Sequence, residues 1–330
     1  MMPASLRPLA RLLLSFLLAL IPTVALAARP GAKAARRKAP EPVQVKGTRV
    51  SLSPPEGFTE APRFQGFQQE ATSASIMVTE LPGPFEETVK GFTPESLASR
   101  DMKLLSRKLV KVGGHPGVLL HLTQTAGDVA WLKWVLVLGD PSATLLVAAT
   151  WREQDSKTLS RSLESAVRST RWEREAAPTP APERFTLKAL PGLKEAHRLQ
   201  NTIMYTRDGT MPAGPVEGPL FIVAPSLGTA SVGDDLEAFN LARLRATPDV
   251  SDLSVESSAA LTVDGLKGHE AVARARHPAT QKDFLLYQAL LVEGDHYYVF
   301  QGRAGEADRA AYLEHFKAAV RGFQRAAATP

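Results

Sequence analysis

The side chains best suited to chemistry in this chain are its histidines and one serine near a glycine. The seven histidines are His115, His121, His197, His269, His277, His296 and His315. No two of them are spaced as zinc ligands usually are, and the chain has no cysteine, so we expect no metal site. Asp295 and His296 could together bind a metal ion, but we favour a structural interpretation, in which Asp295 belongs to a turn and His296 lies at the edge of the next strand.

The segment 224–228 reads Ala-Pro-Ser-Leu-Gly and comes close to the Gly-x-Ser-x-Gly turn that exposes a hydrolase nucleophile. It lacks the first glycine, and no histidine is paired with Ser226 by spacing. We therefore predict no catalytic residue and no cofactor. The alternative is a small-ligand carrier or hydrolase with its site between two domains, which would use Ser226, His277 or His296.

Three residues are candidates for contact with a partner protein. Tyr205 opens a loop rich in glycine and proline, and loops carry binding residues more often than scaffolds do. Tyr297 and Tyr298 are adjacent in an expected strand, so alternation should turn one ring outward. Tyr205, Tyr298 and His296 are the contacts that we predict.

The N-terminus predicts export. Two arginines precede an apolar run from Leu12 to Leu26, and Ala25 and Ala27 give the small-residue pattern that signal peptidase accepts. The run is shorter than the roughly 20 residues that span a bilayer. We predict a signal peptide at 1–27, cleavage before Ala28 and a periplasmic or secreted protein; the alternative is an uncleaved anchor.

The positive charge of the chain lies mostly in the segment that follows. Residues 1–46 carry eight Lys or Arg and one Glu, so the remaining chain has a net charge of −2, since the total is +5. We therefore predict no nucleic-acid partner. Residues 28–46 are predicted to be a disordered basic arm, either a solvated spacer or a peripheral contact with anionic membrane or cell wall.

The rest of the chain contains an internal repeat. Val112–Gly117 reads VGGHPG and Val263–Gly268 reads VDGLKG, and each motif leads into an apolar hairpin followed by a helix. The helices place apolar residues four positions apart: Leu159, Leu163 and Val167 in one copy, Tyr312, Phe316 and Val320 in the other. We predict domains at 47–172 and 184–325, a Pro/Ala linker at 173–183 and a tail at 326–330.

The expected elements define an α+β fold class: two tandem repeats, each an antiparallel sheet packed with helices. An opening strand that ends in Pro55-Glu56-Gly57-Phe58, a late hairpin, and a last helix ending near Trp172 or Phe323 together resemble the PsbP-like fold, an α/β/α sandwich. The second copy departs from this pattern, with Leu193 in place of the aromatic residue. The resemblance implies a non-enzymatic binding module, because known members of the fold act mostly through partners.

The function that we predict is therefore an exported, non-catalytic binding or assembly module of the cell envelope. Its partner would be an envelope protein or a cell-wall component. Two similar domains could also attach bivalently to a repetitive surface.

Overall fold

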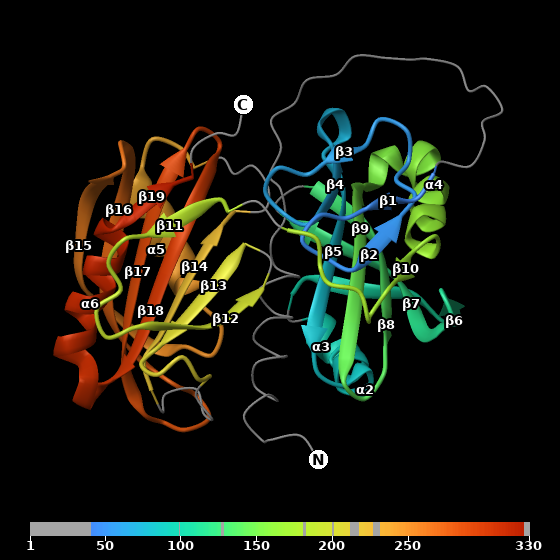
Figure 1. The fold of residues 1–330 in the computed structure, drawn as a ribbon. Coiled ribbons are helices and arrows are strands. Elements are labelled where there is room, and N and C mark those ends of the chain that lie inside the picture. Colours follow the sequence, from blue (N-terminus) through green and yellow to red (C-terminus); the bar gives the residue numbers. More distant parts are fainter. Residues whose placement is uncertain are drawn as a thin grey trace. The chain divides into compact units, whose positions relative to one another are not determined.

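The computed structural model describes residues 41–98, 100–126, 129–180, 183–199, 201–211, 218–226 and 232–326. These residues form two compact units, 41–180 and 183–326, each with its own core (Figure 1). The predicted signal peptide, with Ala25, Ala27 and Ala28, lies outside the described residues, as do residues 327–330 of the predicted tail. No helix within the described ranges is long and apolar enough to cross a membrane.

The first unit is built on a seven-stranded antiparallel sheet. Across the sheet, the strands are β3 (Thr59–Glu60), β4 (Gly66–Gln69), β5 (Ala74–Pro82), β9 (Ala143–Arg152), β8 (Val129–Gly139), β7 (His115–Ala126) and β6 (Met102–Val112). A small sheet joins β1 (Val43–Gln44), β2 (Val50–Leu52) and β10 (Arg171–Trp172). The helices are α2 (Phe85–Lys90), α3 (Pro94–Ala98) and α4 (Ser156–Arg168), with 3-10 turns η2 (Glu70–Thr72) and η3 (Glu153–Asp155).

Helix α4 covers one face of this sheet because its apolar residues recur every four positions. Leu163 is fully buried and belongs to the same core as Trp134 and Trp151 of the sheet. Helix α2 lies over the opposite face, where the Thr88 hydroxyl contacts the Thr144 hydroxyl at 3.4 Å. The sheet therefore has a helix on each face.

The second unit repeats this plan. Across its seven-stranded antiparallel sheet, the strands are β12 (Lys194–Leu199), β13 (Thr202–Thr206), β14 (Leu220–Pro225), β18 (His296–Gly305), β17 (Asp283–Glu293), β16 (Leu266–Arg276) and β15 (Ser251–Val263). A two-stranded sheet joins β11 (Phe185–Leu187) and β19 (Phe323–Arg325). The helices are α5 (Leu236–Arg245) and α6 (Arg309–Arg321), and a 3-10 turn, η4 (Glu306–Asp308), precedes α6.

Helices also cover both faces of the second sheet. Phe316 of α6 is fully buried and stacks on Phe221 of β14, with ring centroids 5.3 Å apart. On the other face, Leu244 of α5 packs in a core with Phe284 and Leu286. The α+β fold class predicted from the sequence, with two antiparallel sheets packed with helices, is confirmed.

The glycines of the repeated motif have the same two roles in both units. Gly114 and Gly265 have φ of +88° and +73°, which suits the tight turns before β7 and β16. Gly117 and Gly268 lie in the strands, where a Cβ would come within 2.5 Å of the Val137 carbonyl oxygen and 2.0 Å of the Leu290 carbonyl oxygen, respectively. The motif thus marks a turn and a point of close strand contact.

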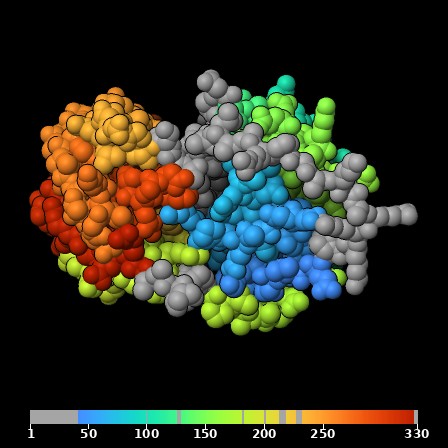
Figure 2. Space-filling model, turned by 90° about the horizontal axis from the view of Figure 1, so that it is seen from above, coloured from blue at the N-terminus to red at the C-terminus, as the bar shows by residue number. Residues whose placement is uncertain are grey.

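The folded unit begins earlier than the predicted boundary at residue 47. Strand β1 pairs with β2, and Val45 is 2% exposed in the core, while Lys46 forms an ion pair with Glu60 at 2.8 Å. In Figure 2 the blue segment that contains β1 lies on the surface of the first unit and packs against the rest of that unit. The prediction of a disordered arm is wrong for residues 43–46, because the apolar Val45 is drawn into the core.

The predicted linker is likewise partly folded. The Arg49 guanidinium donates to the Arg174 carbonyl oxygen at 2.8 Å, and the Gly47 amide donates to the Thr179 hydroxyl at 2.9 Å. Arg174 also lies over the Trp172 ring and pairs with Asp140. Residues 173–180 therefore run along the first unit, and the linker prediction is wrong for them, because polar contacts fix a stretch whose composition is typical of a spacer.

Candidate functional site: a basic edge strand and a buried serine–histidine pair

The sheet register brings together a serine and a histidine that the sequence places 70 positions apart. Ser226 follows β14 and His296 begins β18, and these strands are antiparallel neighbours, with Pro225 opposite Tyr298. The Ser226 Oγ lies 3.3 Å from the His296 Nδ1, within hydrogen-bonding distance. The other ring nitrogen of His296 is 3.5 Å from the Asp295 carboxylate. Sequence spacing alone did not pair Ser226 with a histidine.

The Ser226–His296 pair has a structural role, because it connects two neighbouring strands. Ser226 is only 3% exposed, and its Oγ accepts a hydrogen bond from the Tyr297 amide at 3.2 Å. The Asp295 side chain is 64% exposed, whereas an orienting carboxylate in a catalytic triad is buried. The buried Ser226 hydroxyl offers little surface to a substrate. It instead holds the end of β14 against β18.

His277 does not join this pair. It follows β16, is 7% exposed, and its Nδ1 accepts from the Thr280 amide at 3.2 Å. His277 precedes the first residue of β17, whereas His296 lies opposite the last. Because a strand rises about 3.3 Å per residue, the two histidines lie roughly 30 Å apart. The three residues named for a hydrolase therefore do not form one site.

The two tyrosines predicted to contact a partner are core residues. Tyr205 and Tyr298 are each 5% exposed, and both belong to the core beneath α6. Tyr298 packs on Phe323, with ring centroids 4.8 Å apart. The expectation of one outward ring is wrong, because Tyr297 is also buried, at 3% exposed, on the opposite face under α5. Both faces of this strand are covered by helices.

The most exposed large hydrophobic residue in the described part of the chain lies on β6. Leu109 is 86% exposed and Leu105 is 47% exposed. The strand also carries four cations, none of which forms an ion pair with a residue that the structure describes. We define the basic strip by its exposed residues: Lys103, Leu105, Arg107, Lys108, Leu109 and Lys111. Strand β6 ends the sheet, so its outer side pairs with no described strand.

Strand β15 is the counterpart of β6 in the second unit, with residues 253–263 corresponding to 102–112. Both strands end in a two-residue turn, with Val112 opposite His115 and Val263 opposite Leu266. Both also have an irregularity in register at the same distance before that turn, at Leu105 in β6 and at Glu256 in β15. This fixes how the two strands correspond.

The corresponding residues differ in character. Where β6 has Arg107, Lys108, Leu109 and Lys111, β15 has Ser258, Ala259, Ala260 and Thr262. The same topology thus folds with small neutral residues at these positions, so the charges and the exposed leucine are not needed for the fold. The basic strip was not predicted from the sequence; the difference that reveals it is visible when residues 102–112 are aligned with 253–263.

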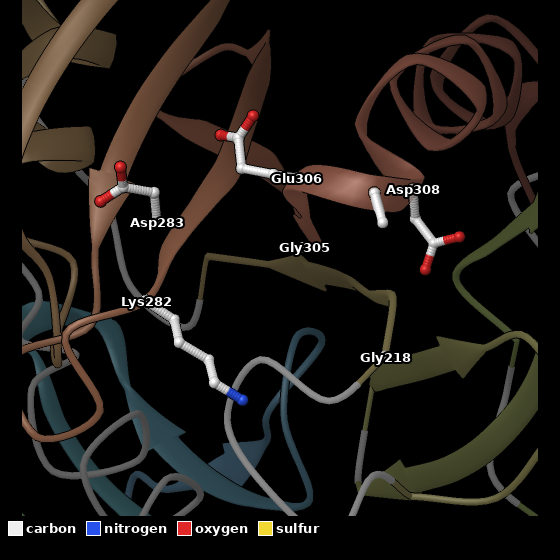
Figure 3. A pocket seen from close by; sticks show the side chains of 7 residues that line it. Gly218, Lys282, Asp283, Gly305, Glu306 and Asp308 are labelled. Carbon is white, nitrogen blue, oxygen red and sulfur yellow. The ribbon is translucent and has the colours of Figure 1, made fainter.

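A hollow in the second unit gathers acidic side chains (Figure 3). It has a volume of about 400 Å³ and is lined by Gly218, Lys282, Asp283, Gly305, Glu306, Ala307 and Asp308. Each carboxylate already has an arginine partner: Asp283 pairs with Arg276, Glu306 with Arg274 and Asp308 with Arg207. Hydrogen bonding from Arg276 lowers the pKa of Asp283. No group of acidic or histidine side chains arranged to hold a metal occurs among the described residues.

Among the described residues, each unit buries one lysine or arginine, and the two lie in corresponding pairs of cross-strand neighbours. Lys133 of β8 lies opposite Thr150 of β9, and Leu286 of β17 lies opposite Arg303 of β18. Thr150 and Arg303 each stand three residues before η3 or η4, so the two pairs correspond. Burial lowers the pKa of Lys133 to about 8. Arg303, whose pKa burial also lowers, donates to the Pro248 carbonyl oxygen at 3.3 Å.

Comparison with known proteins gives no family. No family model matches the chain, and no curated protein matches it. Among solved structures, cyanobacterial PsbP (CyanoP) from Synechocystis sp. PCC 6803 is 12% identical, with a TM-score of 0.31, over 43% of this chain and 98% of that one. The immunity protein TplEi of T6SS from Pseudomonas aeruginosa is 11% identical, with a TM-score of 0.31, over 86% and 97%. Sequence identities and TM-scores this low give no information about the function of this chain.

Proposed function

We propose that this chain is an exported, non-catalytic binding module of the cell envelope, built of two tandem PsbP-like domains, that contacts a partner protein through the basic strip of β6. The observation that supports the proposal is the contrast between the basic strip and its counterpart in β15. One copy of the repeat keeps the fold with small neutral residues, while the other exposes a leucine and four cations that pair with no acidic residue in the described ranges.

The physical chemistry of the strip suits association. Burying a fully exposed leucine contributes about 1.5 to 3 kcal/mol, and Leu109 is 86% exposed in the free chain. The exposed cations of the strip steer an acidic surface towards it and fix the register of the contact. Arg107 and Lys111 flank Leu109 at alternate positions of the strand, so all three side chains lie on one face. An apolar centre with a polar rim is the usual arrangement of a protein interface, and arginine is enriched there.

A hydrolase is the second candidate function, and the distance of 3.3 Å between Ser226 Oγ and His296 Nδ1 favours it. In such an enzyme the histidine would take the serine proton as the serine attacks an ester or amide carbonyl. A survey of ester and peptide substrates, with the intact chain and with Ser226→Ala, tests this candidate. Activity that Ser226→Ala abolishes in a folded protein would contradict the proposal that the protein is non-catalytic.

Export is tested separately. The mature protein should begin at Ala28 and be found in the periplasm or the medium. Intact mass measurement of the protein recovered from each cell fraction checks both points. A cytoplasmic protein that retains Met1 would contradict the export proposal.

The experiment for the binding function is affinity capture of the tagged mature protein from its own envelope fraction, read by mass spectrometry. A strip variant takes the residues of β15: Arg107→Ser, Lys108→Ala, Leu109→Ala and Lys111→Thr. A matched control removes three exposed cations elsewhere, with Lys157→Ala, Lys194→Ala and Lys267→Ala. A third version lacks residues 28–40 and keeps β1.

The proposal expects a stoichiometric companion with the intact protein, the matched control and the arm deletion, and its loss with the strip variant. A companion retained by the strip variant would contradict the proposed surface. A companion lost with residues 28–40 would transfer the function to the arm. An empty capture from all versions would contradict a stable protein partner.

A further inference from the structure

Within the described part of the chain, the outer edge of β6 is open to pairing with another strand. Among the described strands, β6 pairs only with β7, through the register from Met102 opposite Gln124 to Val112 opposite His115. At the edge of a sheet, alternate residues direct their amide and carbonyl groups away from the sheet. Those groups can be satisfied by water or by an added strand.

The stretch available for an added strand is short and well defined. The register shift at Leu105 interrupts regular pairing towards the start of the strand, and the turn at Gly113 and Gly114 follows its last residue. Between them, Ser106–Val112 pairs regularly with β7. An incoming segment therefore has seven residues of straight edge to follow.

Side chains alternate along this edge. Arg107, Leu109 and Lys111 are exposed on one face, while Val110 and Val112 pack on the other face against the core beneath α4. Residues directly opposite each other in an antiparallel pair interact most strongly. A strand that matched the exposed face would place acidic residues opposite Arg107 and Lys111, with an apolar residue opposite Leu109.

A second copy of this chain does not supply such a strand from its own β6 or from the corresponding strand β15. A second β6 would bring its own Arg107, Lys108 and Lys111 against the same cations. The corresponding edge of β15, Ser257–Val263, contains no acidic residue. The other outer strands of the two large sheets do not match either, because β3 has two residues and β12 has Lys194 and Arg198 beside its single acidic residue, Glu195. Charge complementarity therefore points to another protein.

We propose that β6 binds an extended acidic segment of a partner protein as an eighth strand of the first sheet, with acidic residues at alternate positions on either side of an apolar one. This inference rests on the proposed binding function. Backbone hydrogen bonds hold the segment, and the alternating side chains select it, as in other cases of strand addition.

The test uses a synthetic peptide, acetyl-Ser-Glu-Thr-Leu-Thr-Glu-Ser-amide, titrated into the ¹⁵N-labelled mature protein. Amide shifts should change chiefly within Ser106–Val112 and in the facing residues of β7. A peptide of the same sequence with N-methyl groups on the alternate amides that would face β6 cannot donate hydrogen bonds to the edge, and should bind about tenfold more weakly or not at all. The same peptide methylated on the other set of amides should bind like the unmethylated one. Added salt should weaken binding of the unmethylated peptide.

Two protein variants complete the test. Leu109→Asp, a single exposed substitution, should reduce peptide affinity about tenfold, while Lys157→Ala should leave it unchanged. Equal binding of the peptide methylated on the amides that would face β6, or shifts centred outside β6, would overturn the inference. A companion whose capture depends on the strip, together with a peptide that leaves β6 unperturbed, would overturn strand addition and leave the binding function standing. Loss of the companion from every version would overturn the binding function itself.

Discussion

Leu109 and Ala260 occupy the same position in the edge strands of two similar sheets, three residues before the last residue of each strand. Leu109 is 86% exposed and lies between cations, whereas Ala260 lies among small neutral residues. Because both strands pair with their neighbours in the same register, the difference does not arise from folding requirements. Strand β15 therefore serves as an internal control, because it shows that such a strand forms without the exposed leucine and the cations of β6.

The close strand contact at Gly268 predicts a large effect of adding one methyl group. Its Cβ in Gly268→Ala would lie 2.0 Å from the Leu290 carbonyl oxygen, so β16 and β17 would have to separate. We expect the free energy of unfolding to fall by about 3 kcal/mol. Gly265→Asn is the control, because a Cβ there meets nothing within 4 Å and asparagine tolerates positive φ. Urea denaturation measures both; equal stability of the two variants would contradict the packing described.

The buried amine of Lys133 predicts a pH dependence of stability. Burial lowers its pKa from 10.5 to about 8, so the unfolded chain holds this proton more firmly than the folded chain. Between about pH 8 and 10.5 the unfolded state therefore binds more protons, and the contribution of Lys133 to stability rises with pH. Below pH 8 the full cost of burying the charge remains.

Lys133→Met should remove that cost. We expect its free energy of unfolding at pH 7 to exceed that of the unmodified chain by about 2 to 3 kcal/mol, with the difference shrinking as pH rises to 10. Lys157→Met, at an exposed position of α4, serves as the control and should change little. Urea denaturation at pH 7, 8.5 and 10 provides the measurement. A difference between Lys133→Met and the unmodified chain that stayed constant over this range would contradict the assigned pKa.

The buried hydroxyl of Ser226 predicts a loss of stability without a loss of binding. Ser226→Ala leaves the Tyr297 amide without its side-chain acceptor and the His296 Nδ1 without its neighbour. We expect the free energy of unfolding to fall by about 1 kcal/mol, and capture of the companion to continue. Ser258→Ala, which removes a longer contact of 3.5 Å to His269, should have a smaller effect. Unchanged stability in Ser226→Ala would show that the hydroxyl does not fasten the strands.

Local patterns in the sequence were sufficient to predict much of the fold. The four-residue spacing of Leu159, Leu163 and Val167 predicted α4, and the apolar hairpin expected before that helix corresponds to β8 and β9. The long edge strands were missed, because β6 mixes cations with leucines and β15 is rich in serine and alanine. Such strands are specified by pairing with a neighbour, which no local window contains.

The candidate site was harder to predict, for two physical reasons. The 3.3 Å contact between Ser226 and His296 arises from the pairing of β14 with β18, which are separated by three strands in the chain. The burial of Tyr205 and Tyr298 arises from helices and short strands covering the sheet, which alternation along a single strand does not report. Exposure is a property of the packed unit.

The most direct test of the basic strip is photo-cross-linking in the intact cell envelope. A benzophenone side chain placed at Leu109 should form a covalent adduct with a partner protein on illumination. The same group placed at Ala260, its counterpart in β15, should form none. An adduct at 109 alone is the result expected of a binding surface on β6; no adduct at 109, or equal adducts at 109 and 260, would contradict it.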